Sequence, residues 1–300
     1  MDWITGIQNA IDYIEDHLTE RIDYEKVARE SFSSSYHFQR VFSILSGYTL
    51  GEYIRSRRLS LAGTELATGK EKVIDVAAKY GYESPDSFAK AFQKFHGITP
   101  SQARGEGVVL KNFSRLSFKI TLEGGSFMDY KIVEKEGLVL TGFKRRFSGT
   151  PSNRGDQDMD FWVNTRLNQY VLEGLAHDCE TTYEVLTNFD DEGYEFYIAT
   201  YVDPLVRSLM REELGEFADR FEHITIPAGL YLICETERCH YPTDLMADLR
   251  NKAVTEWLPS AGYELTNAPE ITVAHWYYEY QNEQLNGSRY LELWLPIVKK

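Results

Sequence analysis

The feature that most constrains the fold of this chain is a repeat in its first third. Residues 34–50 read SSYHFQRVFSILSGYTL, and residues 84–100 read SPDSFAKAFQKFHGITP. Each copy has apolar residues at i, i+3, i+4 and i+7, the spacing of one buried helix face. Each also has a serine suited to cap the start of a helix and a glycine suited to end it. A short helical run precedes each copy, at residues 24–30 and 74–80, so the pattern predicts two helix-turn-helix units.

Two further helices are expected in the first hundred residues. Apolar spacing predicts an amphipathic opening helix over residues 4–18 that covers the first unit, and a longer helix over residues 50–67 that connects the two units. A rigid connection of this length holds the second helices of both units about one DNA turn apart. The chain has a net charge of −14, which argues against general affinity for nucleic acid. Residues 50–104, however, carry nine basic and six acidic side chains, so a duplex-binding surface is expected in this region.

Residues 5–104 resemble the DNA-binding domain of AraC/XylS-type transcription regulators. The segments that carry the resemblance are SSSYHFQRVF, LGEYIRSRRLSLA and GYESPDSFAKAFQKFHGITPSQAR. The chain departs from the family at Ala103, where an aromatic residue is usual, and at Tyr82, where phenylalanine is usual. By this resemblance, the residues that contact DNA are Ser35, Tyr36, Gln39 and Arg40 in the first unit and Pro85, Asp86, Ala89 and Lys90 in the second.

The chemistry of the two faces agrees with this assignment. Arginine is suited to guanine and glutamine to adenine, with about 1–3 kcal/mol of discrimination each, so Arg40 and Gln39 are expected to read bases. The second helix offers fewer strong donors, and the first helix is therefore expected to supply most of the sequence specificity. Arg55, Arg57 and Arg58 on the connecting helix are expected to contact phosphates or to support the connection. The alternative is that all these residues form the solvated faces of a helical bundle.

After residue 128 the apolar period changes from helical to two. Glycine pairs bracket residues 105–127, which are expected to be a linker, with extended structure over 116–122, between domains at 1–104 and 128–300. The expected strands are residues 130–134, 138–147, 183–189, 194–202, 221–226, 230–237, 270–280 and 289–298. Helices at 159–176 and 243–258 interrupt them. The order ββαββ, found twice, predicts two pseudo-symmetric halves whose strands line a shared groove. The expected fold class is thus multi-domain, with an all-α double helix-turn-helix followed by an α+β domain with duplicated halves.

The last strand indicates what the groove holds. In RYLELWLPI, the leucines point one way, and Tyr290, Glu292 and Trp294 point the other. A carboxylate among aromatic rings suits a lipophilic cation. Without a ligand, this carboxylate is expected to keep water, to take a tyrosine hydroxyl as partner or to have a raised pKa. The alternative is that the aromatics are ordinary core and Glu292 lies at a solvated edge.

Residues 128–300 resemble the GyrI-like, or effector-binding, domain of multidrug-sensing regulators. The matching segments are MDYKIVEKEGLVLTGF, ITIPAGLYLICETE, EWLPSAGYEL and YLELWLPI. The resemblance places the binding glutamate at Glu292. It places the pocket aromatics at Trp162, Tyr197, Tyr201, Trp276 and Trp294.

Together these features predict a ligand-responsive transcription regulator of AraC type, acting as an activator and not as an enzyme. Its expected partners are an operator in double-stranded DNA, a small-molecule effector and RNA polymerase. No cofactor or metal is expected, because Cys179, Cys234 and Cys239 lack CxxC spacing. No apolar run approaches 18 residues and the start lacks a signal peptide, so a cytoplasmic location without membrane contact is expected. Two alternatives stay open: a small-molecule hydrolase with Glu292 as base, and a regulator that binds a protein partner without a ligand.

Overall fold

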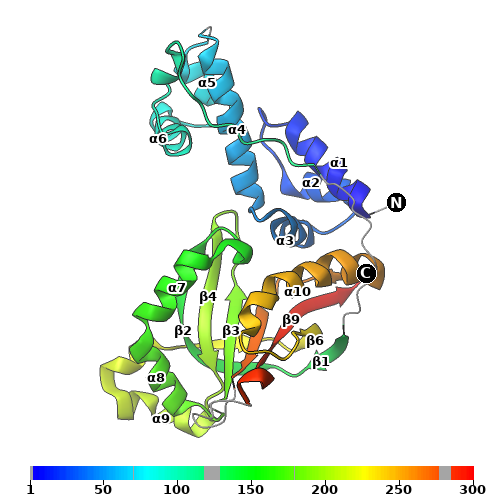
Figure 1. Ribbon diagram of the computed structural model, residues 1–300, viewed down its shortest axis with the longest axis vertical. Coiled ribbons are helices and arrows are strands. Elements are labelled where there is room, and N and C mark those ends of the chain that lie inside the picture. The colour runs from blue at the N-terminus through cyan, green and yellow to red at the C-terminus, as the bar shows by residue number, and fades with distance from the viewer. Residues whose placement is uncertain (1–2, 70, 118–128, 179, 277–284) are drawn as a thin grey trace. The chain divides into compact units, whose positions relative to one another are not determined.

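The computed structural model describes residues 3–69, 71–117, 129–178, 180–276 and 285–300. The chain divides into two compact units, one among the N-terminal helices and one over the C-terminal sheet (Figure 1). The helices of the first unit are α1 (Trp3–Asp16), α2 (Tyr24–Glu30), α3 (Ser35–Ser46), α4 (Leu50–Ala67), α5 (Val73–Lys79) and α6 (Pro85–His96). Both predicted helix-turn-helix units are confirmed, with ends that differ by one or two residues.

The cap residues explain where these helices begin and end. Ser84 accepts a hydrogen bond from the backbone N–H of Ser87 at 3.1 Å, as expected of an N-cap. Gly47 and Gly97 have φ angles of 74° and 80°, the left-handed conformation that glycine adopts without strain. The connecting helix α4 starts with a reciprocal capping box between Thr49 and Glu52.

Helix α4 contributes to the cores of both helix-turn-helix units. In the first, Tyr53 of α4 packs edge-on against Phe42 of α3, with ring centroids 5.6 Å apart. In the second, Leu59 and Leu66 of α4 belong to a buried cluster with Phe88 and Phe92 of α6. The predicted rigid connection between the units is therefore a packed element of both. Figure 1 shows α4 passing between the α1–α3 cluster and the α5–α6 pair.

The segment that follows the second helix-turn-helix packs back along α4. We call residues 108–116 the strap. The backbone N–H of Phe113 donates to Ser60 of α4 at 3.0 Å, and the N–H of Lys111 donates to Nδ1 of His96 at 3.2 Å. The Phe113 ring packs against Tyr53 at 6.0 Å. The start of the expected linker is thus attached to the first unit, whereas most of the expected extended piece, from residue 118, lies outside the described residues.

The second unit contains one antiparallel sheet with a strand order that is symmetric from end to end. Its strands are β1 (Tyr130–Lys135), β2 (Leu138–Ser148), β3 (Thr181–Thr187), β4 (Gly193–Thr200), β5 (Glu222–Ile226), β6 (Gly229–Glu235), β7 (Tyr263–Leu265), β8 (Glu270–His275) and β9 (Tyr290–Lys299). The order is β1-β6-β9-β8-β3-β4-β2-β5, with β7 paired to β9. The central pair, β3 and β8, places Val185 opposite Ile271, and equivalent strands of the two halves follow outward from it. The predicted duplication is confirmed.

Helices cover one face of this sheet. They are α7 (Gly155–Asn164), α8 (Arg166–Leu175), α9 (Pro204–Leu214), α10 (Met246–Lys252) and α11 (Leu258–Ala261), with a π-helical turn at Ala253–Trp257. Figure 1 shows α7, α8 and α10 over the same face. The opposite face, here called the inner face, carries a buried cluster to which β2, β3, β4, β5, β6, β8 and β9 contribute, so the sheet curls around it.

Several predicted elements differ in detail from those observed. The single helix expected at 159–176 is two helices, α7 and α8, which meet at Thr165. Helix α9 and strand β7 were not predicted. Strand β8 ends at His275, and the remainder of the strand expected to reach Tyr280 lies outside the described residues except for Trp276.

Candidate functional site

The residues expected to contact DNA in the first unit lie on α3, on the side away from its buried phenylalanines. Tyr36 and Gln39 are half-buried, and Gln39 donates a hydrogen bond to Ser35 at 3.2 Å. Arg40 is 5% exposed and already has an interaction partner. To read a base with its amide group, Gln39 has to release Ser35.

The corresponding residues of α6 are more accessible. Pro85, Asp86 and Lys90 are exposed and Ala89 is half-buried, while Phe88 on the opposite side is fully buried. The helix presents its N-terminal turn and Lys90 to solvent, as expected of a groove-facing helix. The expected contacts on both helices remain predictions.

Arg57 of the connecting helix forms hydrogen bonds inside the first unit. Its Nε and Nη2 atoms donate to Glu15 of α1 at 2.8 and 2.7 Å, and its Nη1 atom donates to the carbonyl of Phe113 in the strap at 2.5 Å. Tyr53 donates a further hydrogen bond to Glu15 at 2.6 Å. Burial acts to raise the pKa of Glu15, but the hydrogen bonds from Arg57 and Tyr53 lower it below its usual range. The structure therefore places Arg57 inside the first unit, which agrees with the expected support of the connection. The phosphate contact stays a prediction, and Arg55 is exposed.

In the second unit, Glu292 lies on the inner face with two hydrogen-bond donors. Nε2 of His275 is 3.2 Å from Oε1, and the indole Nε1 of Trp294 donates to Oε2 at 2.7 Å. Burial acts to raise the pKa of Glu292, but these two hydrogen bonds and the charge of Lys131 lower it. Because an ionised carboxylate only accepts hydrogen bonds, Nε2 of His275 carries a proton. The sequence led us to expect that Glu292 keeps water, accepts a hydrogen bond from a tyrosine hydroxyl or has a raised pKa. Among the described residues, its hydrogen-bond partners are instead the imidazole of His275 and the indole of Trp294. The pKa of Glu292 is lowered and not raised.

Aromatic rings and one lysine surround Trp294. Tyr183 and Tyr231 lie with ring centroids 6.5 and 6.2 Å from it. The Nζ atom of Lys135 is 3.9 Å from the centroid of the Trp294 ring, which is cation–π distance. Trp294 is 8% exposed. The site therefore combines an ionised carboxylate with an aromatic face that already carries a positive charge.

Tyr197 and Tyr201 belong to the same inner-face cluster but to the other half of the sheet. In the sheet, Tyr197 pairs with Val185, Val185 with Ile271, and Ile271 with Trp294. Tyr197 and Trp294 therefore lie in one row across the central strands. Its hydroxyl is 3.4 Å from Glu195, and Lys144 lies over its ring at 5.5 Å. Tyr197 thus occupies in the first half of the sheet the position that Trp294 occupies in the second half.

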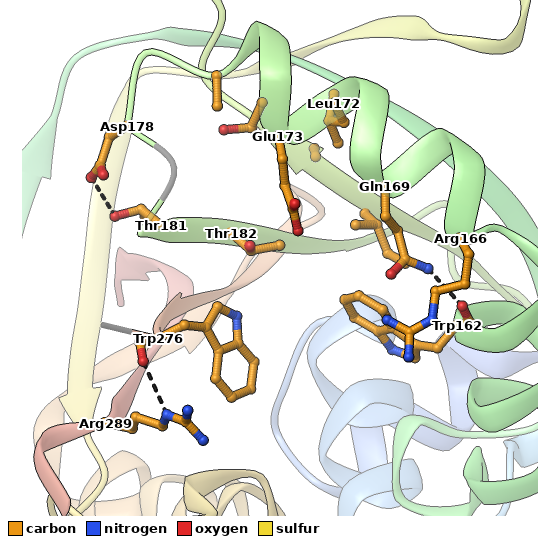
Figure 2. A pocket seen from close by; sticks show the side chains of 14 residues that line it. Trp162, Arg166, Gln169, Leu172, Glu173, Asp178, Thr181, Thr182, Trp276 and Arg289 are labelled. Atoms are coloured by element: carbon orange, nitrogen blue, oxygen red, sulfur yellow. Dashed lines mark hydrogen bonds between the residues drawn. The ribbon is translucent and has the colours of Figure 1, made fainter. Parts of the chain in front are cut away.

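The last two expected pocket aromatics, Trp162 and Trp276, lie on the other face of the sheet. They line a cavity of about 260 Å³ between α8 and the strands (Figure 2). Arg166 lies beside Trp162, and Arg289 donates to the carbonyl of Trp276 at 3.0 Å. The structure therefore separates the six expected ligand-binding residues, with Glu292, Trp294, Tyr197 and Tyr201 on the inner face and the other two on the helix-covered face.

Sequence reasoning missed His275, Tyr183, Lys131 and Lys135, which complete the surroundings of Glu292. Each of these residues lies in or at the end of a predicted strand. The sequence did not show which strands are neighbours, so it could not place these side chains beside Glu292. Across the part of the chain that the structure describes, no group of histidine, cysteine or carboxylate side chains is arranged to hold a metal ion. Among the same residues, no helix is both long and apolar enough to span a membrane.

The two units define a class of protein in which a double helix-turn-helix is joined to an effector-binding sheet. A family model described as "Helix-turn-helix domain" matches residues 27–106, and one described as "Integron-associated effector binding protein" matches residues 131–297. The chain belongs to the family of integron-associated effector binding proteins, with an AraC-type DNA-binding domain in front of the effector-binding part. It is a DNA-binding transcription regulator with a GyrI-like ligand-binding domain.

Relatives match both parts. The HTH-type transcriptional activator AarP of Providencia stuartii is 44% identical over 98 residues, which are 33% of this chain and 73% of the relative. The regulatory protein SoxS of Salmonella typhimurium is 39% identical over 98 residues, 33% of this chain and 92% of SoxS. The right origin-binding protein of Escherichia coli is 29% identical over 203 residues, 66% of this chain and 68% of that protein.

Two solved structures are similar to this chain over a little more than half of its length. The protein SAV2435 bound to tetraphenylphosphonium has a TM-score of 0.42 at 13% identity, over 57% of this chain and 94% of that one. An integron cassette protein of Vibrio cholerae has a TM-score of 0.38 at 15% identity, over 56% of this chain and 95% of that one.

Proposed function

We propose that this protein activates transcription from an operator in double-stranded DNA when a small lipophilic cation binds beside Glu292. The observation that carries the proposal is the inner-face site, where an ionised carboxylate adjoins an aromatic ring that already accommodates a positive charge. Carboxylates and aromatic faces are the groups that recognise such cations. The description of AarP as an activator supports the direction of regulation, and RNA polymerase is the further partner that activation requires.

A catalytic role for Glu292 is less well supported. A general base works best when its pKa lies near the operating pH, whereas the hydrogen bonds from His275 and Trp294, with the charge of Lys131, lower the pKa of Glu292. The relatives of the first unit are transcription regulators. A search for turnover of bound esters or other small substrates tests the hydrolase alternative directly.

The test compares two ligands of similar shape and different charge. Tetraphenylphosphonium is the cationic probe and triphenylphosphine oxide the neutral one, each titrated calorimetrically into wild type and into Glu292→Gln. We expect the wild type to prefer the cation and the variant, which keeps the shape of the side chain, to lose that preference. Thermal unfolding and operator binding serve as controls and should be unchanged. Equal affinity of the wild type for both probes refutes a cation sensor, and no binding of either favours the protein-partner alternative.

A further inference from the structure

The inner face carries the same local arrangement in each half of the sheet. In both halves a carboxylate precedes an aromatic residue by two positions and receives a hydrogen bond from it. The two versions are Glu195 with Tyr197, at 3.4 Å, and Glu292 with Trp294, at 2.7 Å. A lysine lies over each ring, Lys144 over Tyr197 at 5.5 Å and Lys135 over Trp294 at 3.9 Å.

The two lysines differ in how firmly they are held. Lys144 forms ion pairs with Glu222 at 3.0 Å and with Glu195 at 3.4 Å. The hydrogen bond with Glu222 raises the pKa of Lys144, so this side chain stays protonated. Among the residues that the structure describes, Lys135 makes no ion pair, and its ammonium rests on the ring of Trp294. In the first half the lysine is therefore held by ion pairs. In the second half a lysine without an ion pair among the described residues covers the aromatic ring.

We infer that Lys135 is an internal competitor for the ligand: its ammonium occupies the cation position on Trp294 until a ligand displaces it. The inference rests on the proposed function, because it concerns the same site. One face of a single ring accommodates one cation closely, and two positive charges at this position repel each other. Lys135 is half-buried on a flexible stem, so its ammonium can return to water without disturbing strand β1.

The displacement also defines which cations bind. A lysine ammonium is compact and strongly hydrated, so it regains much hydration when it leaves the ring. A ligand gains most from the exchange when its own charge is spread and weakly hydrated and its apolar surface covers the ring. The site should therefore select bulky aromatic or quaternary cations over small primary amines, which resemble the lysine that they would have to replace.

The magnitude follows from the contact that the ligand has to replace. Cation–π contacts contribute about 0.5–2 kcal/mol, depending on their exposure. Removal of the charge of Lys135 should therefore raise the affinity for a cation by about two- to thirty-fold, since each 1.4 kcal/mol corresponds to a factor of ten. Lys135→Met removes the charge and keeps most of the side-chain length, and Lys135→Arg keeps the charge.

The experiment titrates tetraphenylphosphonium and triphenylphosphine oxide into wild type, Lys135→Met, Lys135→Arg and Lys144→Met. We expect Lys135→Met to bind the cation about two- to thirty-fold more tightly than wild type. The neutral probe should gain less, because the charge of Lys135 does not repel it. Lys135→Arg should bind neither probe more tightly than wild type, because a guanidinium keeps the charge, is more weakly hydrated and stacks more firmly on the ring. Lys144→Met is the comparison variant, because its lysine covers the equivalent ring in the other half. It should leave the cation affinity of the site beside Glu292 within about twofold, and any binding to the carboxylates that it frees should be resolved as a second site in the stoichiometry.

Four outcomes overturn the inference. If wild type binds the cation and Lys135→Met binds it no more tightly, the inference is wrong and the proposed function stands. An equal gain for the neutral probe identifies a steric effect, and an equal gain in Lys144→Met identifies a general effect of net charge. If neither wild type nor Lys135→Met binds the cation, the proposed function fails and the inference fails with it. Thermal unfolding of each variant, with Lys135→Gln as a second charge-removing substitution, excludes a folding defect as the cause.

Discussion

The ion pair between Arg57 and Glu15 should stabilise the first unit strongly. Their side chains are only 11% and 9% exposed, and the same guanidinium also holds the carbonyl of Phe113 in the strap. Loss of one partner from a buried ion pair costs about 3–5 kcal/mol, since the remaining charge stays buried without compensation. Because both side chains keep about a tenth of their surface exposed, we expect Arg57→Met to lower the free energy of unfolding by about 3 kcal/mol.

Urea unfolding of the full chain, followed by circular dichroism, measures this change, and hydrogen exchange of peptides from α1, α4 and the strap locates it. Arg55→Met is the matched control, because Arg55 is exposed on the same helix; it should change stability by no more than about 0.5 kcal/mol. Glu15→Gln combined with Arg57→Met should cost less than the sum of the single changes, because no buried charge is then left alone. Equal costs for Arg57→Met and Arg55→Met refute the reasoning. A second refuting result is an Arg57→Met variant with unchanged stability and lower affinity for every duplex, because this result would show that Arg57 contacts phosphates.

Four further predictions follow from the two units. Arg40→Ala should cost about 1–3 kcal/mol of operator affinity and relax specificity at one base pair; equal loss on operator and random duplex contradicts base reading. Limited proteolysis should release a stable C-terminal fragment of about 170 residues with the strap left uncut, and Phe113→Ala should open the strap to cleavage. Trp276→Phe should leave tetraphenylphosphonium affinity unchanged and Trp294→Ala should reduce it, because only Trp294 adjoins Glu292; the reverse order would move the site to the helix-covered face. Finally, since the pKa of Glu292 is lowered, cation affinity should be constant above about pH 4.5, near the ordinary pKa of glutamate, and should fall only in more acidic solution; a loss already at pH 6 would contradict recognition by this carboxylate.

The helical unit was predictable because its signals are local. Caps, apolar spacing and the repeat each occupy a dozen residues, and all pointed to the same helices. The strands of the second unit were also visible from alternation, but their neighbours were not. Strands β1 and β2 are separated by two residues and look like a hairpin, yet β1 pairs with β6 and β2 with β5. Helix α9 was missed although Pro204 at its first turn is a typical start signal.

The functional residues show the same division. The spacing of α4 placed Arg57 on a polar face, but it could not reveal that Glu15, 42 residues earlier, faces the same guanidinium. The alternation of β9 correctly put Glu292 and Trp294 on one face. It could not show that His275 completes this site while the adjacent Trp276 points to the opposite face. Which side chains meet depends on strand order and register, and these are set by packing across the whole sheet.

The duplicated sheet explains why a ligand should bind away from its symmetry axis. A symmetric site would lie over the central pair of Val185 and Ile271, but both side chains are fully buried and fill that position. Each half instead offers its own carboxylate and aromatic ring at equal distance from the axis. In the first half Lys144 forms ion pairs with two carboxylates, so its ammonium is held in place over the ring of Tyr197. In the second half the carboxylate of Glu292 is ionised and the aromatic face is covered by a lysine without an ion pair among the described residues. The same scaffold can thus keep one half for stability and use the other for recognition, because the difference between them is how firmly one lysine is anchored.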